Sequence, residues 1–360
     1  MTNRKRIALV TLDYPPERGG VARYLGNLVE ESRGEIAVFV NRTHRAMGPG
    51  HVEAVTLIEE GWPAWWPMVG FMKGLRDKHM DSVLVSHALP CGTAAWIARL
   101  QGGLPYGVLM HGLDLRLARR NAWKRFLLRR ILRNAKLVIA NSQVVATEIR
   151  DFDPRITPLL LTPGVEERSF PAREIARRAF DIPADTFQLL AVTRLVPRKG
   201  IDRLIQSMAL LPPDVRLTVI GDGTDRERLL TLAQSLGERV RFLHEVDDTE
   251  RDAWYAASDV FALPVRDEGD DVEGFGIVFL EAAQAGLPCI AGKSGGAVEA
   301  VIDEQTGLLV PPNDPQAIAG AIARLRGDLL FRQRLGMAGK ARVAADFRWS
   351  DRWGKLKERL

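Results

Sequence analysis

The chain has 360 residues, and its 46% of hydrophobic and 26% of charged residues are typical of a soluble globular protein long enough for two domains. The net charge of +5 is unevenly divided, because residues 1–160 carry 23 Lys and Arg against 14 Asp and Glu, whereas residues 161–360 carry 27 against 31. Cys91 and Cys289 lie outside any CxxC or Cys/His cluster, and the longest near-apolar stretch, Gly61–Met72, is too short to span a bilayer. These features argue against a disulfide framework, a zinc cluster and a membrane-spanning helix, so we expect a cytoplasmic protein whose membrane contact is at most peripheral.

Short β-branched runs alternate with longer amphipathic stretches along the whole chain. Continuous apolar strands separated by helices are typical of parallel sheets covered on both faces. The sequence therefore predicts an α/β fold with two Rossmann-like, doubly wound domains. The expected strands are Arg6–Thr11, Ile36–Val40, Ser82–Ser86, Tyr106–Met110 and Leu137–Ala140 in the first half, and Gln188–Val192, Arg216–Ile220, Val240–Leu243, Val260–Leu263, Cys289–Ala291 and Gly307–Val310 in the second.

Prolines and a glycine cluster between the two series of strands, at residues 153–164, and a polar segment follows at 166–178. We expect a linker near 160–185, a first domain over 1–165, a second over 166–345, and a terminal helix over 346–360 that returns to the first domain. Doubly wound sheets bind ligands beyond the carboxyl ends of their strands, so candidate residues are sought in the loops that follow strands.

The loop after the first strand contains Asp13, Gly19 and Gly20, just before an amphipathic helix predicted from about residue 21. Paired glycines let a ligand approach backbone N–H groups at a helix N-terminus. Two glycines in a loop are more often only a turn.

His111 and Asp114 follow the Tyr106–Met110 strand, and Asn141 follows the next one. A histidine in such a loop suits contact with a polar substrate or a developing charge, although a structural histidine is the common alternative. Asn141 either lines a cleft or belongs to a helix cap.

Arg194 and Lys199 follow the first strand of the second half. Five residues apart across a turn, they suit a diphosphate, the arginine through its planar fork and the lysine as a point charge. A solvated turn is the alternative, and we interpret Arg198 as a surface charge.

The most informative stretch begins at Glu273 and ends at Pro288. An apolar run there predicts a helix whose free N–H groups and dipole attract an anion. Glu281 lies about two helical turns after Glu273, roughly 12 Å along a helix axis, which suits a diphosphate-linked ligand. An ordinary capped helix with an acidic N-terminus is the alternative. The residues at the expected start of the helix are Gly274, Phe275, Gly276 and Ile277.

The Glu-x7-Glu pattern of Glu273 and Glu281, with its internal Gly-Phe-Gly, resembles the hallmark of the retaining glycosyltransferases of family four, which have the GT-B fold. The resemblance continues over 257–264, 292–301 and 307–311, and residues 271–296 look closest to bacterial phosphatidylinositol and lipid-linked mannosyltransferases. It implies two facing domains with a cleft between them.

The resemblance also implies an activity. We expect transfer of a hexose, mannose from GDP-mannose, to a hydroxyl of a lipid-linked or polysaccharide-precursor acceptor. A UDP-sugar-dependent glucosyl- or N-acetylglucosaminyltransferase with a soluble acceptor and a non-catalytic nucleotide-sugar-binding scaffold are the alternatives. The family generally works without a metal ion or another cofactor, so we expect none.

Residue roles follow from the same resemblance. Arg194 and Lys199 match the pair that binds the donor diphosphate. Glu273 matches the residue that holds sugar hydroxyls, and Glu281 matches the ribose ligand. His111 matches a histidine beside the donor sugar. On the nucleotide side, Gly221 lies near the nucleotide and Val246 contacts the base through its backbone. The loop of Gly19 and Gly20 reaches the donor phosphate and the acceptor, and Asp13 and Asp114 belong to the acceptor side.

Two stretches of the basic half suggest a lipid surface. Arg116–Lys136 has nine basic residues and no acidic one, and it predicts one basic amphipathic helix suited to an anionic membrane. In Trp62–Lys78, tryptophans precede basic residues, as at a lipid interface or an apolar acceptor channel. A solvated helix face and a packed aromatic patch are the alternatives. Nucleic acid is not an expected partner, because no motif for it accompanies the charge.

Overall fold

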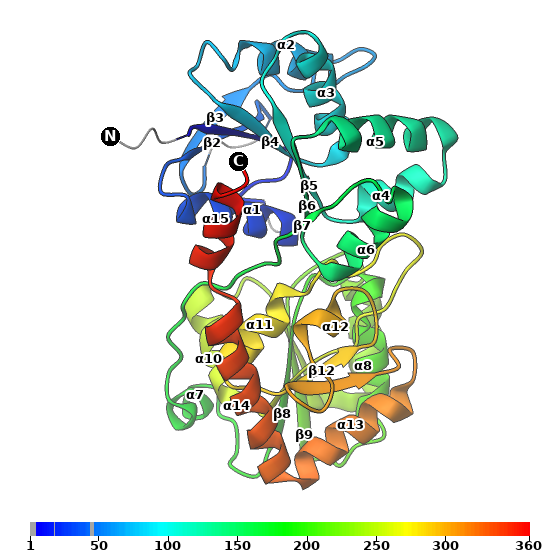
Figure 1. The fold of residues 1–360 in the computed structure, drawn as a ribbon. Helices are drawn as coiled ribbons and strands as arrows, with labels where there is room; N and C mark the ends of the chain where they lie inside the picture. The colour runs from blue at the N-terminus through cyan, green and yellow to red at the C-terminus, as the bar shows by residue number, and fades with distance from the viewer. Residues whose placement is uncertain (1–4, 18, 44–46) are drawn as a thin grey trace. The chain divides into compact units, whose positions relative to one another are not determined.

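A computed structural model describes residues 5–17, 19–43 and 47–360, which form two compact units (Figure 1). The first unit comprises the described residues up to Gly164 together with Trp349–Leu360, and the second comprises Val165–Arg348. Phe347 and Arg348 thus belong to the second unit, and the last twelve residues belong to the first.

The first unit contains a seven-stranded sheet in which all neighbouring strands are parallel, in the order β3-β2-β1-β4-β5-β6-β7. Alternate residues of β1 enter different buried clusters, Ala8 and Val10 on one face and Ile7 and Leu9 on the other, so both faces are covered. The strands are β1 (Ile7–Val10), β2 (Ile36–Asn41), β3 (His51–Val55), β4 (Ser82–Ser86), β5 (Tyr106–Met110), β6 (Leu137–Ala140) and β7 (Leu159–Leu160). The helices are α1 (Gly20–Glu31), α2 (Trp66–Gly74), η1 (Ala88–Gly92), α3 (Thr93–Leu100), α4 (Leu113–Arg119), α5 (Ala122–Asn134), α6 (Gln143–Phe152) and α15 (Trp349–Lys357).

The last helix, α15, packs on α1 within the first unit. The rings of Tyr24 and Trp349 meet edge to face with centroids 5.2 Å apart, and the Tyr24 hydroxyl donates a hydrogen bond to the Leu161 carbonyl at 2.8 Å. Arg352 donates to the Thr162 hydroxyl at 2.9 Å. These contacts fix the C-terminal segment on the first unit.

The second unit contains a six-stranded parallel sheet in the order β10-β9-β8-β11-β12-β13. Its strands are β8 (Phe187–Val192), β9 (Val215–Ile220), β10 (Val240–Leu243), β11 (Val260–Leu263), β12 (Cys289–Gly292) and β13 (Gly307–Val310). Its helices are α7 (Arg173–Ala179), η2 (Pro197–Lys199), α8 (Ile201–Met208), α9 (Arg226–Ala233), η3 (Gln234–Arg239), α10 (Asp248–Ala257), α11 (Ile277–Gln284), α12 (Ala297–Ala300), α13 (Pro315–Gly327) and α14 (Leu329–Asp346).

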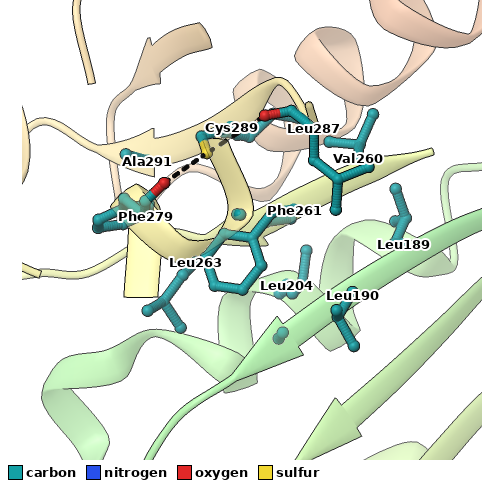
Figure 2. Close-up of a cluster of buried hydrophobic side chains, with 14 of the residues drawn as sticks. Leu189, Leu190, Leu204, Val260, Phe261, Leu263, Phe279, Leu287, Cys289 and Ala291 are labelled. Atoms are coloured by element: carbon teal, nitrogen blue, oxygen red, sulfur yellow. Dashed lines mark hydrogen bonds between the residues drawn. The ribbon is translucent and has the colours of Figure 1, made fainter. Parts of the chain in front are cut away.

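Figure 2 shows the core of the second unit around Phe261 and Cys289. The Cys289 thiol lies 3.6 Å from the Phe279 carbonyl oxygen and 3.8 Å from that of Leu287. Cys91 is likewise buried, and both cysteines are free thiols. Both cysteines are therefore small buried side chains of the core.

The strand order reverses once in each sheet, between β1 and β4 and between β8 and β11. At such a point the loops after the two strands lead away to opposite sides and leave space at the carboxyl edge of the sheet. The loops after β1, β4, β8 and β11 are therefore the places where each unit can hold a ligand.

Every strand predicted from the sequence is present, but β3 and β7 were not predicted. β3 is partly exposed and contains His51 and Glu53, and β7 has only two residues, so neither has the continuous apolar run of a buried parallel strand.

The prediction of one helix over Arg116–Lys136 is wrong. Asn121 separates α4 from α5, because its side chain accepts a hydrogen bond from the Lys124 amide at 3.0 Å and starts a new helix. Among the helices that the structure describes, none is both long and apolar enough to cross a membrane.

The buried position of Leu190 on β8 gives a test of the core. Leu190 is 0% exposed, so Leu190→Ala removes buried methyl groups and leaves a cavity that should lower the free energy of unfolding by about 2–5 kcal/mol. Urea unfolding of the full chain, followed by far-UV circular dichroism, measures the change. Leu330→Ala on α14, where the side chain is 78% exposed, is the control and should change the free energy by less than about 0.5 kcal/mol. Equal effects of the two substitutions would contradict the packing.

Candidate functional site

In the second unit, a buried ion pair connects the loops that follow β8 and β11. Lys199 ends the short η2 turn and is only 8% exposed, as is Glu273. The Lys199 ammonium donates a hydrogen bond to Glu273 Oε2 at 2.5 Å. The structure thus brings together two residues that the sequence placed in one site.

Arg198 contacts the same carboxylate, so its interpretation as a surface charge is wrong. Its side chain is 12% exposed, and its Nη1 donates to Glu273 Oε2 at 2.7 Å. Its Nε lies 2.9 Å from Asp271 Oδ1. The loop after β11 places Asp271 and Glu273 against the guanidinium group. The residues next to Arg198 in the sequence do not indicate this contact.

These charges determine the protonation of Glu273. Burial would raise the pKa of Glu273, but the positive charges of Lys199 and Arg198 outweigh burial and lower it to about 2. Burial also lowers the pKa of Lys199, and among the weaker influences the nearby charge of Arg194 acts in the same direction. Glu273 is therefore a carboxylate at neutral pH, surrounded by an excess of cations.

Helix α11 begins just after this pair. Gly276 is its N-cap residue, with φ 86°, and as a glycine it has no side chain with which to cap the first turn. The first backbone N–H groups of α11 thus have no side-chain cap and can attract an anion, although the Phe279 amide already donates to the Gly276 carbonyl at 3.0 Å. Phe275 is 3% exposed and packs its ring on that of Phe347, with centroids 5.8 Å apart, whereas Gly274 is partly exposed.

Glu281 lies deeper than the sequence suggests. It is 1% exposed, and its Oε2 accepts a hydrogen bond from the Tyr255 hydroxyl at 3.1 Å, while Arg168 Nη2 lies 3.8 Å from its Oε1. The predicted separation of two helical turns from Glu273 is wrong, because Glu273 lies in the loop before the helix. Only the four steps from Ile277 to Glu281 contribute helical rise, about 6 Å.

The other predicted donor-side residues lie in neighbouring loops of the same sheet edge. Arg194 is exposed in the loop after β8, and Val246 is partly buried in the loop between β10 and α10. Gly221 follows β9 with φ 143°, and a Cβ there would lie 1.8 Å from the Thr193 carbonyl oxygen. Only glycine therefore permits the close contact between the loops after β8 and β9.

In the first unit, His87 is a candidate that our sequence analysis missed. It follows β4 with φ 97°, and its Nε2 lies 3.2 Å from Asp13 Oδ2, in the loop after β1. The hydrogen bond to His87 lowers the pKa of Asp13. Burial alone would lower the pKa of His87, but the hydrogen bond to Asp13 and the charge of Asp114 raise it overall. The sequence could have identified His87 as a candidate, because it directly follows a buried strand, as His111 does after β5.

His111 lies beside His87, with ring centroids 6.1 Å apart. Its Nδ1 lies 3.2 Å from Asn141 Nδ2, and its Nε2 lies 3.2 Å from Ser86 Oγ. With the Asn141 amide donating to Nδ1, the neutral ring carries its proton on Nε2. Burial and the charge of His87 lower the pKa of His111 to about 3, so this ring is neutral at physiological pH.

Asp114 completes this cluster from the first turn of α4. Its Oδ2 accepts a hydrogen bond from the Ala88 amide at 2.6 Å, and burial raises its pKa. Gly19 and Gly20 start α1 after the same loop as Asp13, and among the described residues no atom lies within 4 Å of a Cβ added to either glycine. The first unit thus gathers Asp13, His111 and Asp114 around His87 and leaves the two glycines open.

No group of three or more His, Cys, Asp or Glu residues in the described part of the chain is arranged to hold a metal ion.

The opposite pKa shifts of the two histidines give a test by NMR. In protein labelled with ¹⁵N-histidine, His87 should titrate above its ordinary value of 6.5, whereas His111 should stay neutral and protonated on Nε2 from about pH 8 to 5. Asp13→Asn removes the hydrogen bond that raises the His87 pKa, so the His87 titration should move to lower pH. His87→Gln and His111→Gln assign the two signals. If His111 took up a proton near its ordinary pKa, the described cluster would be incorrect.

Two family models match the chain. Residues 172–342 match Glycosyl transferases group 1, and residues 18–163 match Glycosyltransferase Family 4. The chain is 33% identical, over 98% of its length and 97% of the relative, to the GDP-mannose-dependent alpha-(1-6)-phosphatidylinositol monomannoside mannosyltransferase of Mycolicibacterium smegmatis. It is 30% identical, over 97% of its length and 96% of the relative, to the GDP-mannose-dependent monoacylated alpha-(1-6)-phosphatidylinositol monomannoside mannosyltransferase of Corynebacterium glutamicum.

Solved structures show the same fold. The sucrose-phosphate synthase of Thermosynechococcus elongatus superposes with a TM-score of 0.82 at 27% identity, covering 99% of this chain and 98% of that one. Anabaena HepE in complex with UDP and glucose superposes with a TM-score of 0.80 at 22% identity, covering 97% and 98%. The predicted pair of α/β domains of the GT-B class is confirmed. Since full-length relatives and both family models agree, this chain is a glycosyltransferase and belongs to family four, the group 1 glycosyltransferases.

Proposed function

We propose that this protein transfers mannose from GDP-mannose to a hydroxyl of a lipid-linked acceptor, with retention of the anomeric configuration and without a metal ion or other cofactor. The observation that carries the proposal is the buried Lys199–Glu273 pair directly before the uncapped start of α11. It places cations, a carboxylate and free backbone N–H groups within one loop region of the second unit.

The chemistry of glycosyl transfer requires such a set of groups. When the bond between the sugar and the diphosphate breaks, negative charge builds up on the diphosphate, and fixed positive groups lower this barrier. Lys199 has three N–H donors and gives one to Glu273, so others remain for a phosphate. Arg194 and the N-terminus of α11 add further positive charge. Glu273, ionised at neutral pH, can accept hydrogen bonds from sugar hydroxyls.

The same cations support a reaction without a metal ion. In metal-dependent transferases, a divalent ion neutralises the departing diphosphate. Here Arg194 and Lys199, in the loop after β8, and the N-terminus of α11 supply positive charge for the diphosphate. In the first unit, the neutral His111 would serve the sugar as a hydrogen-bonding partner, and Asp13 and Asp114 would bind the acceptor.

The relatives support the choice of donor and acceptor. Both mannosyltransferases described above are named as GDP-mannose-dependent enzymes that act on a phosphatidylinositol mannoside. A UDP-sugar-dependent transferase is the second candidate, because HepE has been crystallised with UDP and glucose. A non-catalytic scaffold is less well supported, because Lys199, Glu273 and His111 are all present.

Nucleotide binding and transfer test this proposal. By calorimetry, the protein should bind GDP and GDP-mannose more tightly than UDP, ADP and their sugar conjugates. Arg194→Ala should weaken GDP binding at least about tenfold, because it removes a charge-assisted contact to phosphate. With GDP-mannose and a phosphatidylinositol mannoside, the product should be an α-mannoside by NMR, formed equally well in EDTA.

Arg178→Ala, at an exposed arginine of α7 in the same unit, is the matched control and should bind GDP normally. Preference for UDP and its sugars would favour the second candidate. If the folded protein bound no nucleotide, the proposed donor site would be wrong.

We further propose that α4 and α5 carry the protein peripherally onto an anionic membrane, where a lipid-linked acceptor would be found. Trp123 and Phe126 of α5 are 68% and 48% exposed, and their rings stack with centroids 5.9 Å apart. Arg130 lies over the Phe126 ring, 5.2 Å from its centroid. Exposed aromatic rings beside arginines suit the interface of an anionic bilayer.

Not every basic residue of Arg116–Lys136 belongs to this surface. Arg116 is 8% exposed and pairs with Glu148 at 3.2 Å, and Arg133 pairs with Asp153 at 2.5 Å. In the Trp62–Lys78 stretch, Trp62 is 97% exposed. Helix α2 of this stretch packs on α3, and α5 packs on α3 as well. The two stretches therefore cover the same face of the first sheet.

Vesicle binding tests the membrane proposal. A Trp123→Ser, Phe126→Ser double variant should bind vesicles that contain phosphatidylglycerol roughly tenfold more weakly than the unmodified protein, because two aromatic anchors are lost. Raising the salt concentration should weaken the binding of both proteins. Leu330→Ser, at an apolar residue of the second unit that is 78% exposed, should bind like the unmodified protein. Undiminished binding by the double variant would contradict a role for α5.

A further inference from the structure

The two oxygens of the Glu273 carboxylate have different surroundings. Oε2 accepts hydrogen bonds from both Lys199 Nζ, at 2.5 Å, and Arg198 Nη1, at 2.7 Å. Among residues 5–17, 19–43 and 47–360, no group donates a hydrogen bond to Oε1. One oxygen is thus saturated by cations, while the other can still accept hydrogen bonds from a ligand.

The guanidinium group of Arg198 is itself fixed. The Arg266 amide donates a hydrogen bond to the Arg198 carbonyl at 2.8 Å, which joins the loops after β8 and β11. Arg266 in turn donates to Asp202 at 2.7 Å, at the start of α8. Asp271 Oδ1 lies 2.9 Å from Nε, whereas Glu273 contacts Nη1. Arg198 is therefore held by its backbone and by two carboxylates.

The backbone of Glu273 is held with similar rigidity. The Gly296 amide donates a hydrogen bond to the Glu273 carbonyl at 2.8 Å, so the loop after β12 supports the residue. A Cβ at Gly296 would lie 2.2 Å from the Gly274 carbonyl oxygen, which only glycine avoids. Both partners of the Arg198–Glu273 contact are thus presented by anchored loops.

We propose that Arg198 is a positioning residue of the donor site: by binding Oε2 of Glu273, it directs Oε1 to the hydroxyls of the donor sugar and leaves Lys199 free to bind the donor diphosphate. The inference rests on the proposed function and deepens it. Arg198 contacts Glu273 and acts through it, and it does not contact the phosphate.

Because Lys199 and Arg198 share Oε2 of Glu273, Lys199 does not have to neutralise and orient this carboxylate alone. A lone lysine beside a buried carboxylate would be drawn fully into that pair, since each is the only compensation for the other. A second cation with planar geometry fixes the orientation of the carboxylate and shares its charge, so Lys199 keeps N–H donors for a phosphate. Small misplacements of a group that orients substrate can reduce a rate by about 10²-fold.

Kinetics of Arg198→Gln test the proposal. Its kcat for glycosyl transfer should fall about 10- to 100-fold, while KM for the nucleotide sugar changes less than about threefold. The affinity for the nucleoside diphosphate without sugar should stay within about threefold of the unmodified protein, because the phosphate contacts remain. Arg198→Lys should recover part of kcat, and Arg178→Gln on α7 should behave as the unmodified protein does.

The pH profile separates positioning from a general structural defect. Removing Arg198 takes away one of the two cations that lower the pKa of Glu273 and also removes the cation that pairs with Asp271, while Lys199 remains. The pKa of Glu273 should therefore rise, and the acid limb of kcat/KM should move to higher pH. ¹³C NMR of carboxyl-labelled glutamate, assigned with Glu273→Gln, should show the same upward shift in protein without ligand.

The outcomes distinguish this inference from the proposed function. If the unmodified protein neither binds nucleotides nor transfers a sugar, the proposed function fails, and the donor-site role of Arg198 fails with it. If the protein is active but Arg198→Gln loses affinity for the nucleoside diphosphate tenfold or more, with the Glu273 titration unmoved, Arg198 binds phosphate directly and the positioning role is overturned. An unchanged kcat would overturn it as well.

Discussion

The mutual neutralisation of Lys199 and Glu273 is the constraint on which the candidate donor site depends. A charge taken out of water without a partner costs several kcal/mol, so each of these buried residues requires the other. They belong to loops after different strands, and their contact therefore fixes the loop after β8 against the loop after β11. Arg198 and Asp271 join the same contact, while Arg194 remains exposed close by. Three cations thus face two carboxylates next to the N-terminus of α11, an arrangement that favours a bound anion.

The strands could be predicted because buried parallel strands form continuous apolar runs, as in Val260–Leu263, and because the loops after them are where doubly wound sheets bind ligands. The same logic found His111, Lys199 and Glu273. It failed for Arg198 and His87, since a sequence shows the residue type and not the partner. Arg198 is largely buried because Asp271 and Glu273 come from another loop, and the pKa of His87 is raised because Asp13 and Asp114 approach it from other elements.

The residue at which α11 begins also determines how Glu273 and Glu281 are placed relative to each other. The spacing of Glu273 and Glu281 predicted a separation of about two helical turns, but Gly276 adopts a left-handed conformation and the helix begins only after it. The two residues consequently have different surroundings, one beside cations at the sheet edge and the other beside Tyr255 in the core. Contact of Glu281, which is 1% exposed, with a ribose stays a prediction.

The two sheets use the same electrostatic arrangement at the same topological position. In each, an ion pair joins the loop after the first strand of the sheet to the loop after the fourth, where the strand order reverses: Asp13 with His87 in the first unit, and Lys199 with Glu273 in the second. The signs are exchanged, since the first loop supplies the acid in one unit and the base in the other. The degree of burial also differs, with side chains 44% and 25% exposed in the first pair but 11% and 10% in the second. Solvent screens the more exposed pair, and the pKa of its histidine is raised from an ordinary value close to neutrality, whereas the pKa of Glu273 in the second pair is lowered to about 2. The first unit therefore has a histidine whose charge responds to pH near neutrality, whereas the second has a carboxylate that stays ionised over the same range.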